Sequence, residues 1–212
     1  MTAYVFDPQV IHEISCKHLG KPLEQIFDDV IAELSERYPG MIDTSKPWIY
    51  SNAGGVMIQM KLYHATTKEY LMIWGTPIGS EGHTGRNLVA FYDTVLDGEA
   101  WYYKEGEFTR SVYTPGDHIL VDKGEAAGMH YPDHVWMIEY ARGPLLTLFP
   151  FGLADGLLST LDFKTVYQTL AIYFSLLTRQ FSKAQKLVAG GLAAAALVLW
   201  TTRSRRRRRP HK

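Results

Sequence analysis

Between residues 47 and 143, short alternating apolar stretches follow one another with turn-forming residues between them, and no other feature limits the fold as much. The stretches "VMIQMKLYHA" (56–65) and "KEYLMIWGTPIG" (68–79) alternate with a period of two, which is the period of a β-strand. Pairs such as Asp97-Gly98 separate the stretches as turns do. Several short strands at this spacing predict a β-sandwich or a β-barrel. In the first stretch the period of two places one set of residues on a common face: Val56, Ile58, Met60, Leu62 and His64.

Two of these predicted strands each carry one carboxylate among apolar residues. Glu139 lies in "HVWMIEYA" (134–141) and Asp93 lies in "NLVAFYDTVL" (87–96). A charged carboxylate in such a place is destabilising unless it is paired or protonated. If both strand faces line one cavity, the two acids share a proton, and the pair can move protons to and from an apolar substrate or hold a cation. The alternative for Glu139 is a structural residue at a strand end, neutralised by Arg142.

Helical patterns flank the strands on both sides. Residues 6–40 predict one or two helices, with Asp7 as the N-cap before Pro8 and an end at Tyr38-Pro39-Gly40. From Pro144 onward the chain is helical and apolar. Its last helical stretch has an apolar stripe wide enough to cover a barrel or to lie in a membrane interface. The stripe consists of Phe163, Val166, Tyr167, Leu170, Ile172, Tyr173, Phe174, Leu176 and Leu177.

The formal net charge of zero hides an uneven distribution along the chain. Seven of the 22 basic residues lie in residues 203–212, directly after the uncharged apolar segment 187–202. That segment is shorter than the roughly 20 residues of a typical spanning helix, but flanking basic side chains can extend it by reaching toward the headgroups. We therefore expect a membrane contact rather than a nucleic-acid contact or a disordered basic tail.

Motifs of other chemistries are missing from the sequence. The single cysteine, Cys16, excludes an intramolecular disulfide and a multi-cysteine metal site. The eight histidines are scattered, and we expect no metal and no other cofactor. The glycine-rich stretch 75–86 lacks the Gly-Lys-Ser/Thr of a phosphate-binding loop, and no Gly-x-Ser-x-Gly sequence occurs. The first residues, "MTAYVFDPQV", do not have the pattern of a signal peptide.

Several longer motifs resemble the family of fungal sterol C-8 isomerases and sigma-1 receptors. The resemblance runs from about residue 3 to about residue 180, in the same order and with similar spacing. The motifs are "NAGG" (52–55), "LYHATTKEYLMIWGTPIG" (62–79), "EGHTGR" (81–86), "YDTVLDGE" (92–99), "YTPGD" (113–117), "WMIEYARG" (136–143) and "STLDF" (159–163).

The resemblance implies an α+β fold in which N-terminal helices and two C-terminal, membrane-adjacent helices accompany a cupin-like β-barrel. It also implies a location at the endoplasmic reticulum membrane and a homotrimer. On this basis we expect four regions. They are an N-terminal helical segment (1–46), the barrel (47–143), amphipathic membrane-adjacent helices (144–182), and an apolar segment with an arginine-rich tail (183–212).

The same resemblance assigns roles to individual residues. It implies that Glu139 and Asp93 are the buried catalytic acids and that Tyr70 braces the glutamate. It implies structural hydrogen bonds for Arg86, His64 and Glu69. The remaining implied positions line the substrate pocket, although ordinary core packing is the alternative for each of them: Val56, Met60, Leu62, Met72, Trp74, Tyr131 and Tyr173.

Two departures from the family pattern concern the C-terminal half. Gly156 stands where the family usually has a larger residue. Family members usually begin with a membrane-spanning helix, whereas this sequence starts at the domain, so we expect the segment 187–202 to serve as the anchor. Lumenal arginines would then oppose the usual bias of positive charge toward the cytoplasm.

The resemblance leaves two functions. One is an isomerase that moves a sterol double bond from position 8 to position 7 through a carbocation, with cationic amphiphilic amines as inhibitors. The other is a non-catalytic receptor or chaperone of the sigma-1 type, which binds hydrophobic amines or sterols with the same glutamate. The wording of residues 75–86 and 139–143 is closer to the fungal enzymes, so the sequence favours the isomerase.

Overall fold

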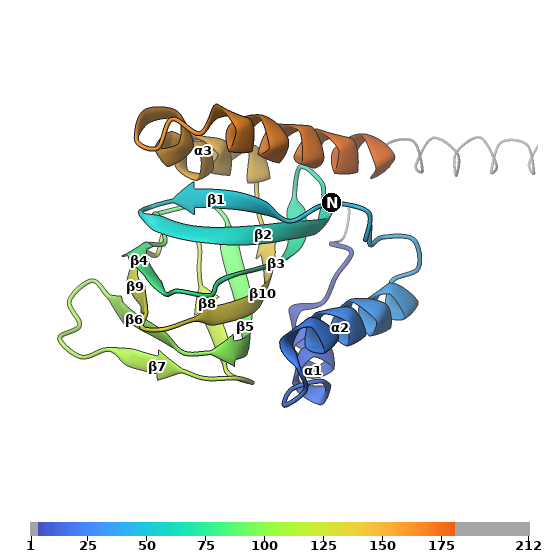
Figure 1. Ribbon diagram of the computed structural model, residues 1–212, viewed down its shortest axis with the longest axis horizontal. Coiled ribbons are helices and arrows are strands. Elements are labelled where there is room, and N and C mark those ends of the chain that lie inside the picture. The colour runs from blue at the N-terminus through green and yellow to red at the C-terminus, as the bar shows by residue number, and fades with distance from the viewer. Residues whose placement is uncertain (1–3, 181–212) are drawn as a thin grey trace, which may run out of the picture. The chain divides into compact units, whose positions relative to one another are not determined.

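Two antiparallel β-sheets form the centre of the fold in a computed structural model that describes residues 4–180 (Figure 1). The larger sheet has the order β1 (Ile49–Ala53), β2 (Val56–Ala65), β3 (Glu69–Thr76), β10 (Val135–Arg142), β5 (Ala90–Gly98) and β8 (His118–Val121). The smaller sheet has the order β4 (Ser80–His83), β9 (Ala127–Tyr131), β6 (Ala100–Lys104) and β7 (Ser111–Tyr113). The predicted α+β class with a cupin-like barrel is confirmed.

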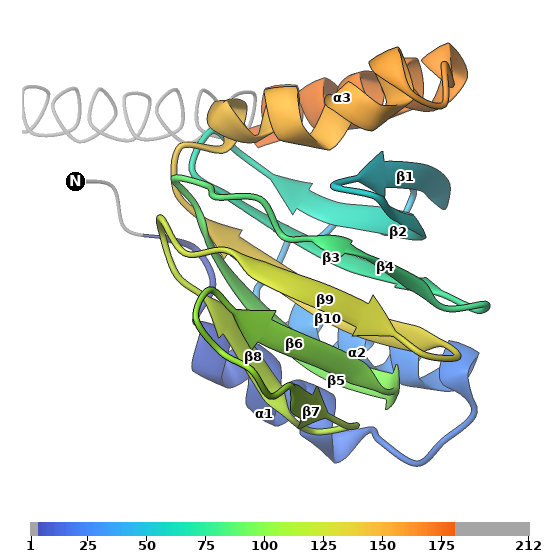
Figure 2. The same cartoon turned by 90° about the vertical axis from the view of Figure 1, so that its left-hand side faces the viewer.

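Two helices cover the outer face of the larger sheet (Figure 2). They are α1 (Pro8–Lys17) and α2 (Leu23–Arg37). Asp7 caps α1 as predicted, because its side chain accepts a hydrogen bond of 2.9 Å from the Gln9 N–H. The helices bury their apolar stripes against outward-facing side chains of β3 and β10, which leaves the inner face of the sheet free for a cavity. This outer core contains Ile26, Phe27, Val30, Ile31, Leu34, Leu71, Ile73, Trp136, Ile138 and Tyr140.

A β-bulge in β2 corrects one expectation about strand faces. The pairing of β2 with β3 shifts between Leu62 and His64, so that Leu62 pairs with Met72 but His64 pairs with Leu71. An extra residue in one strand reverses the side-chain alternation beyond it. His64 therefore does not share the face of Leu62: its ring packs edge-on against Phe6, in the outer core, and its Nδ1 lies 2.9 Å from a backbone oxygen.

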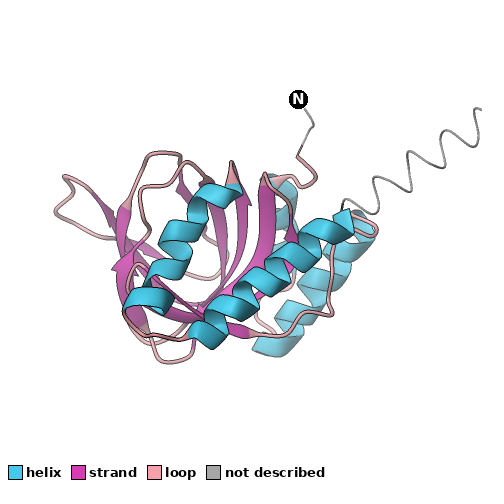
Figure 3. Ribbon diagram, turned by 90° about the horizontal axis from the view of Figure 1, so that it is seen from above, coloured by secondary structure: helices cyan, strands magenta, loops and turns pink. Residues whose placement is uncertain are grey.

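Helices close the other side of the barrel (Figure 3). After β10 come the short helix η1 (Leu145–Leu148), then α3 (Phe149–Leu158), and then a last helix over residues 163–180. The N–H of Gly55, in the turn between β1 and β2, donates to the carboxylate of Asp155 in α3 at 2.9 Å. Gly156 is the buried residue of α3, and a Cβ there would lie 2.9 Å from the Val166 side chain, so the glycine permits close helix packing.

The apolar stripe of the last helix is divided between two directions. Ile172, Tyr173 and Leu176 are buried against the barrel. Three other members of the stripe are largely exposed, and so are two leucines that precede the helix: Phe163, Tyr167 and Phe174, and Leu158 and Leu161. The helix thus packs on the barrel with one side and presents an apolar surface on another.

Within residues 4–180, the structure contains no helix long and apolar enough to cross a membrane. The predicted anchor, 187–202, and the basic residues 203–212 lie outside the described part of the chain. All residues that build the cavity belong to one compact unit, Met1–Leu176.

Candidate functional site

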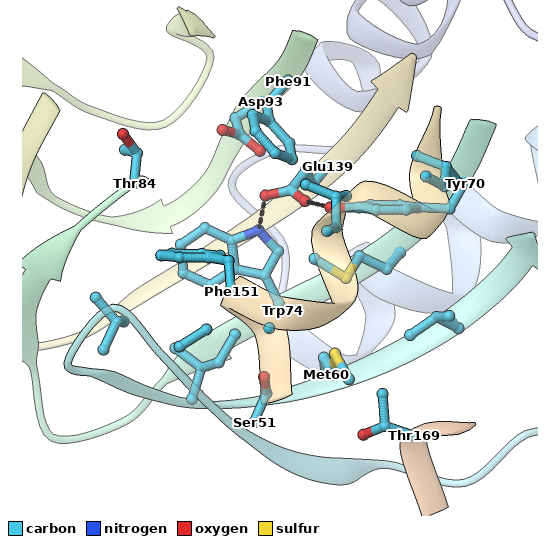
Figure 4. Close-up of a pocket in the computed structure, with 18 of the residues that line it drawn as sticks. Ser51, Met60, Tyr70, Trp74, Thr84, Phe91, Asp93, Glu139, Phe151 and Thr169 are labelled. Carbon is cyan, nitrogen blue, oxygen red and sulfur yellow. Dashed lines mark hydrogen bonds between the residues drawn. The ribbon is translucent and has the colours of Figure 1, made fainter. Parts of the chain in front are cut away.

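The two buried carboxyls are direct neighbours across adjacent strands. In the register of β10 with β5, Glu139 is paired with Asp93, and on its other side Glu139 is paired with Met72 of β3. Paired residues on adjacent antiparallel strands point to the same face of the sheet. Both acids therefore point into the barrel (Figure 4) and line the same cavity, which the sequence alone had left open.

A largely apolar cavity of about 200 Å³ lies in front of the two acids. Its walls come from both sheets, and η1, α3 and the last helix close it. Most of the sequence-predicted pocket residues line it: Val56, Met60, Leu62, Tyr70, Met72, Trp74 and Tyr173. The cavity also has lining residues that were not predicted: Ser51, Ala53, Ile58, Thr84, Phe91, Tyr102, Val121, Met129, Leu145, Leu148, Phe149, Phe151, Gly152, Leu153 and Thr169.

Tyr131 is the predicted pocket residue that the structure places elsewhere. It is fully buried behind the cavity wall, where its ring packs edge-on against Trp74. Its hydroxyl lies 2.9 Å from the hydroxyl of Tyr102, which itself lines the cavity. Tyr131 belongs to the second sheet, at the end of β9. Its size and burial there make it a support for the residues that do face the cavity.

Two aromatic side chains hold the carboxylate of Glu139. The Tyr70 hydroxyl donates a short hydrogen bond to Oε1, and the Trp74 indole Nε1 donates to Oε2 at 3.0 Å (Figure 4). Both donors come from β3, where Tyr70 and Trp74 lie four residues apart and therefore on the same face of the strand. Glu139 is only 8% exposed, so these two bonds replace the water that a surface carboxylate would have.

Arg142 does not neutralise Glu139, so the structural alternative for this glutamate is wrong. Arg142 lies three positions after Glu139 along β10, and residues an odd number of positions apart point to opposite faces of a strand. The Arg142 guanidinium lies on the outer side, where it donates to the Tyr140 hydroxyl at 3.0 Å and to the backbone oxygen of Phe6. Glu69, predicted to be structural, accepts hydrogen bonds from Val5 N–H and the Tyr140 hydroxyl there.

The surroundings of the two carboxyls shift their pKa values to different extents. Burial raises the pKa of Asp93 well above its usual range, and the nearby charge of Glu139 raises it further. Burial also raises the pKa of Glu139, but hydrogen bonds from Tyr70, Asp93 and Trp74 act in the opposite direction. Asp93 is therefore the carboxyl that keeps the proton, and Glu139 is the one that ionises.

Asp93 has one oxygen that no other group satisfies. Its Oδ1 is fully buried and has no hydrogen-bond partner among residues 4–180. A buried polar atom of this kind is destabilising unless a bound molecule uses it. Asp93 lines the cavity, so a molecule bound there would lie near this oxygen.

Comparison with known protein families identifies the family of this chain. A family model described as "ERG2 and Sigma1 receptor like protein" matches residues 1–185. The chain belongs to this family.

Relatives of both kinds within the family match the chain equally well. Sigma non-opioid intracellular receptor 1 from Gallus gallus is 40% identical over 172 residues, which cover 80% of this chain and 78% of the relative. C-8 sterol isomerase from Pyricularia oryzae is 39% identical over 174 residues, which cover 80% and 79%. C-8 sterol isomerase ERG2 from Gibberella zeae is 38% identical over 172 residues, which cover 80% and 73%. Overall identity does not separate the two kinds of relative.

Solved structures are also similar to parts of the chain. KdgF from Halomonas sp. is 18% identical, with a TM-score of 0.40 over 49% of this chain and 91% of that structure. A predicted oxalate decarboxylase from Thermotoga maritima is 16% identical, with a TM-score of 0.39 over 48% and 97%.

Strand alternation carries a signal for some of the cavity-lining residues that were not predicted as pocket residues. Ile58 lies between Val56 and Met60 in the alternation of β2, and Phe91 lies two residues before Asp93 in β5. The same rule therefore places both of them on the cavity side. The lining residues of η1 and α3 have no such signal, because an apolar helix can present any of several faces to the barrel.

Proposed function

We propose that this protein is a sterol C-8 isomerase, which moves a double bond of a sterol ring system from position 8 to position 7. One observation carries the proposal: Asp93, whose pKa burial raises well above its usual range, and Glu139 lie directly opposite each other in a largely apolar cavity. Such a pair can give a proton to one atom of an apolar substrate and take a proton from another.

In the proposed reaction Asp93 donates its proton to carbon 9. The electron pair of the 8,9 double bond forms the new C–H bond, which leaves a cation at carbon 8 and a carboxylate on Asp93. Glu139 then takes a proton from carbon 7, and the electrons of that C–H bond form the 7,8 double bond. Carbons 7 and 9 are both neighbours of carbon 8, so two adjacent carboxyls suit them. Asp93 must regain a proton before the next cycle.

The cavity supports the charge that develops at carbon 8. An ionised Glu139 faces the cation in surroundings with little water, where electrostatic stabilisation is strongest. Tyr70 and Trp74 fix the carboxylate through their hydrogen bonds, so it need not reorganise as the charge forms. Their rings also offer electron-rich faces near the reacting carbons.

A second function, binding of hydrophobic amines without catalysis, is favoured by the same glutamate. A buried carboxylate held beside aromatic rings suits an ammonium group as well as a carbocation. Receptor relatives match the chain as well as isomerase relatives do. The two functions differ in whether a sterol is converted, because a receptor needs Glu139 but needs no proton on Asp93.

Expression in an isomerase-deficient yeast, followed by sterol profiling, tests the proposal. We expect sterols with a double bond at position 7 to replace those with a double bond at position 8. Glu139→Gln is the matched control, because it keeps the shape of the side chain but removes the charge. It should give no conversion at equal expression. Persistent position-8 sterols with the well-expressed wild-type protein would contradict the isomerase and favour the receptor.

We also propose that the protein acts at the endoplasmic reticulum membrane. The exposed apolar side chains of the last helix, among them Phe163, Tyr167 and Phe174, suit a lipid surface. Sterols dissolve in that phase. Fractionation of cells that express the tagged chain should recover it with an endoplasmic reticulum marker, whereas recovery in the supernatant would contradict this location.

The homotrimer implied by the resemblance stays a prediction, and light scattering of the purified protein in detergent tests it.

A further inference from the structure

Six side chains with a hydroxyl group line the cavity, and four of them are already satisfied. Tyr70 donates to Glu139, and Tyr102 bonds with Tyr131. Tyr173 donates to the backbone oxygen of Thr66 at 2.6 Å, and Thr84 accepts from the Ala127 N–H at 2.9 Å. The other two are Ser51 and Thr169, for which the structure of residues 4–180 provides no hydrogen-bond partner.

Thr169 differs in this respect from other hydroxyl residues in the helices of the chain. A helical serine or threonine usually returns its hydroxyl to a backbone oxygen three or four residues earlier. Ser15 donates to Ile11 O at 2.8 Å, and Ser35 donates to Ile31 O at 2.6 Å. Thr169 lies in the helix 163–180 and makes no such bond. Its hydroxyl is therefore available to the cavity.

Ser51 and Thr169 lie across the cavity from the two acids. Figure 4 shows both of them on the side opposite Glu139 and Asp93, with Met60 nearby. The strand order agrees, because β1, which carries Ser51, is separated from β10 by β2 and β3. Adjacent strands are roughly 4.8 Å apart, so the two polar ends of the cavity are well separated. The wall between them is formed largely by apolar side chains.

We propose that Ser51 and Thr169 together bind the ring hydroxyl of the sterol and so determine which end of the substrate faces the acids. The inference rests on the proposed function and deepens it. A sterol is a rigid apolar skeleton with a hydroxyl at one end, so fixing the hydroxyl also fixes the position of the ring double bond. Each of these side chains can donate and accept one hydrogen bond, which matches an alcohol and does not require a charged group.

A site built to bond a hydroxyl discriminates against an analogue that lacks it, because the polar groups of the site then stay unpaired. The direct test is binding of two radiolabelled ligands to the full-length protein in detergent. One is a sterol with a double bond at position 8, and the other is its analogue without the ring hydroxyl. We expect the wild-type protein to prefer the alcohol on the order of tenfold or more. In the double variant Ser51→Ala/Thr169→Val this preference should fall toward one, through weaker binding of the alcohol.

Matched variants separate loss of the hydroxyl from loss of the fold. Thr169→Ser keeps a hydroxyl at the same place and should retain the preference. Thr67→Val makes the same change as Thr169→Val at an exposed threonine outside the cavity and should also retain it. Binding of the analogue without the hydroxyl shows that the pocket of each variant is intact. If the double variant loses it, the single variants Ser51→Ala and Thr169→Val provide the comparison.

Two results would overturn the inference: equal binding of both ligands to the wild-type protein, or an unchanged preference in the double variant. Sterol conversion is measured separately on the same preparations. A wild-type protein that prefers the alcohol but converts no sterol would contradict the isomerase and leave the hydroxyl site standing. A protein that converts sterol without any such preference would support the isomerase and contradict the hydroxyl site.

Discussion

Glu139 owes its chemistry to its immediate neighbours. A glutamate buried without partners would stay protonated, because burial raises its pKa. Tyr70 and Trp74 counter this effect with hydrogen bonds to the two carboxylate oxygens. Burial and the neighbouring charge of Glu139 raise the pKa of Asp93, and the hydrogen bond from Trp74 opposes them only in part. Two carboxyls in the same cavity thus acquire opposite roles from the side chains around them.

The first prediction concerns Tyr70→Phe, which removes one donor to Glu139 and keeps the ring. Since that hydrogen bond lowers the pKa of Glu139, we expect the pKa to rise in the variant. Isomerisation requires the ionised form, so the acidic limb of kcat/KM against pH should move to higher pH. Tyr103→Phe, at an exposed tyrosine, is the control. An unmoved acidic limb in Tyr70→Phe would contradict the role given to this hydroxyl.

The second prediction concerns Asp93→Asn and the dependence of stability on pH. The pKa of Asp93 is raised in the folded protein, so the folded state keeps a proton that the unfolded chain releases above the ordinary value of 3.8. The stability of the wild-type protein therefore falls as pH rises through this window. Asparagine does not titrate, so the variant should gain thermal stability relative to wild type as the pH rises above about 4.

The same variant should isomerise poorly, by a factor of about 10² or more, because it has no proton to donate. Parallel unfolding midpoints of the two proteins over the whole pH range would show that Asp93 titrates as an ordinary carboxyl. Wild-type turnover by Asp93→Asn would remove it from the mechanism.

At the scale of single elements, β10 has one face that lines the cavity and another that packs under the N-terminal helices. Glu139 faces the cavity, while Trp136, Ile138 and Tyr140 pack under the N-terminal helices. The outer face has its own polar network, in which the Glu69 carboxylate accepts from the N–H of Val5 at 3.0 Å and from the Tyr140 hydroxyl at 2.6 Å. This network attaches the segment before α1 to the sheet without taking part in the cavity.

The third prediction follows from that separation. Glu69→Ala removes the acceptor of the half-buried Val5 N–H and one of the two acceptors of the buried Tyr140 hydroxyl, and the loss of such partners costs roughly 1–3 kcal/mol for each group. Urea unfolding should therefore show a loss of about 3 kcal/mol. The kcat for sterol conversion should stay at the wild-type value at temperatures where the variant is folded. A large fall in kcat for folded protein would show that the outer network reaches the acids.

Strand alternation was enough to predict much of the cavity wall. It identified Asp93 and Glu139 as acids on apolar faces and gave the correct face for Val56, Met60 and Leu62. It did not show that β5 and β10 are neighbours, because 36 or more residues separate them and their pairing depends on the whole sheet. The family resemblance supplied that expectation. Nothing in the sequence "KLYHA" indicates the bulge before His64, so the predicted strand face of His64 was wrong.

At the scale of the whole domain, the cavity depends on parts of the chain that are far apart in sequence. Helix α3 is joined to the β1–β2 turn through Asp155, and the last helix is joined to the β2–β3 turn through the bond from Tyr173 to Thr66. These contacts hold the helices over the cavity that contains the acids. Sequence periodicity indicated apolar helices there, but which side faces inward depends on these long-range bonds.

The most direct test of the account compares a hydrophobic amine, cationic at neutral pH, with its neutral carbon isostere. Their affinities for the wild-type protein and for Glu139→Gln are measured by displacement of a labelled ligand. If Glu139 is an ionised group that faces a carbocation, the wild-type protein should prefer the amine by about 10²-fold or more, and Glu139→Gln should erase the preference. Equal affinity of the amine and the isostere for the wild-type protein would contradict the ionised Glu139 on which the proposed mechanism depends.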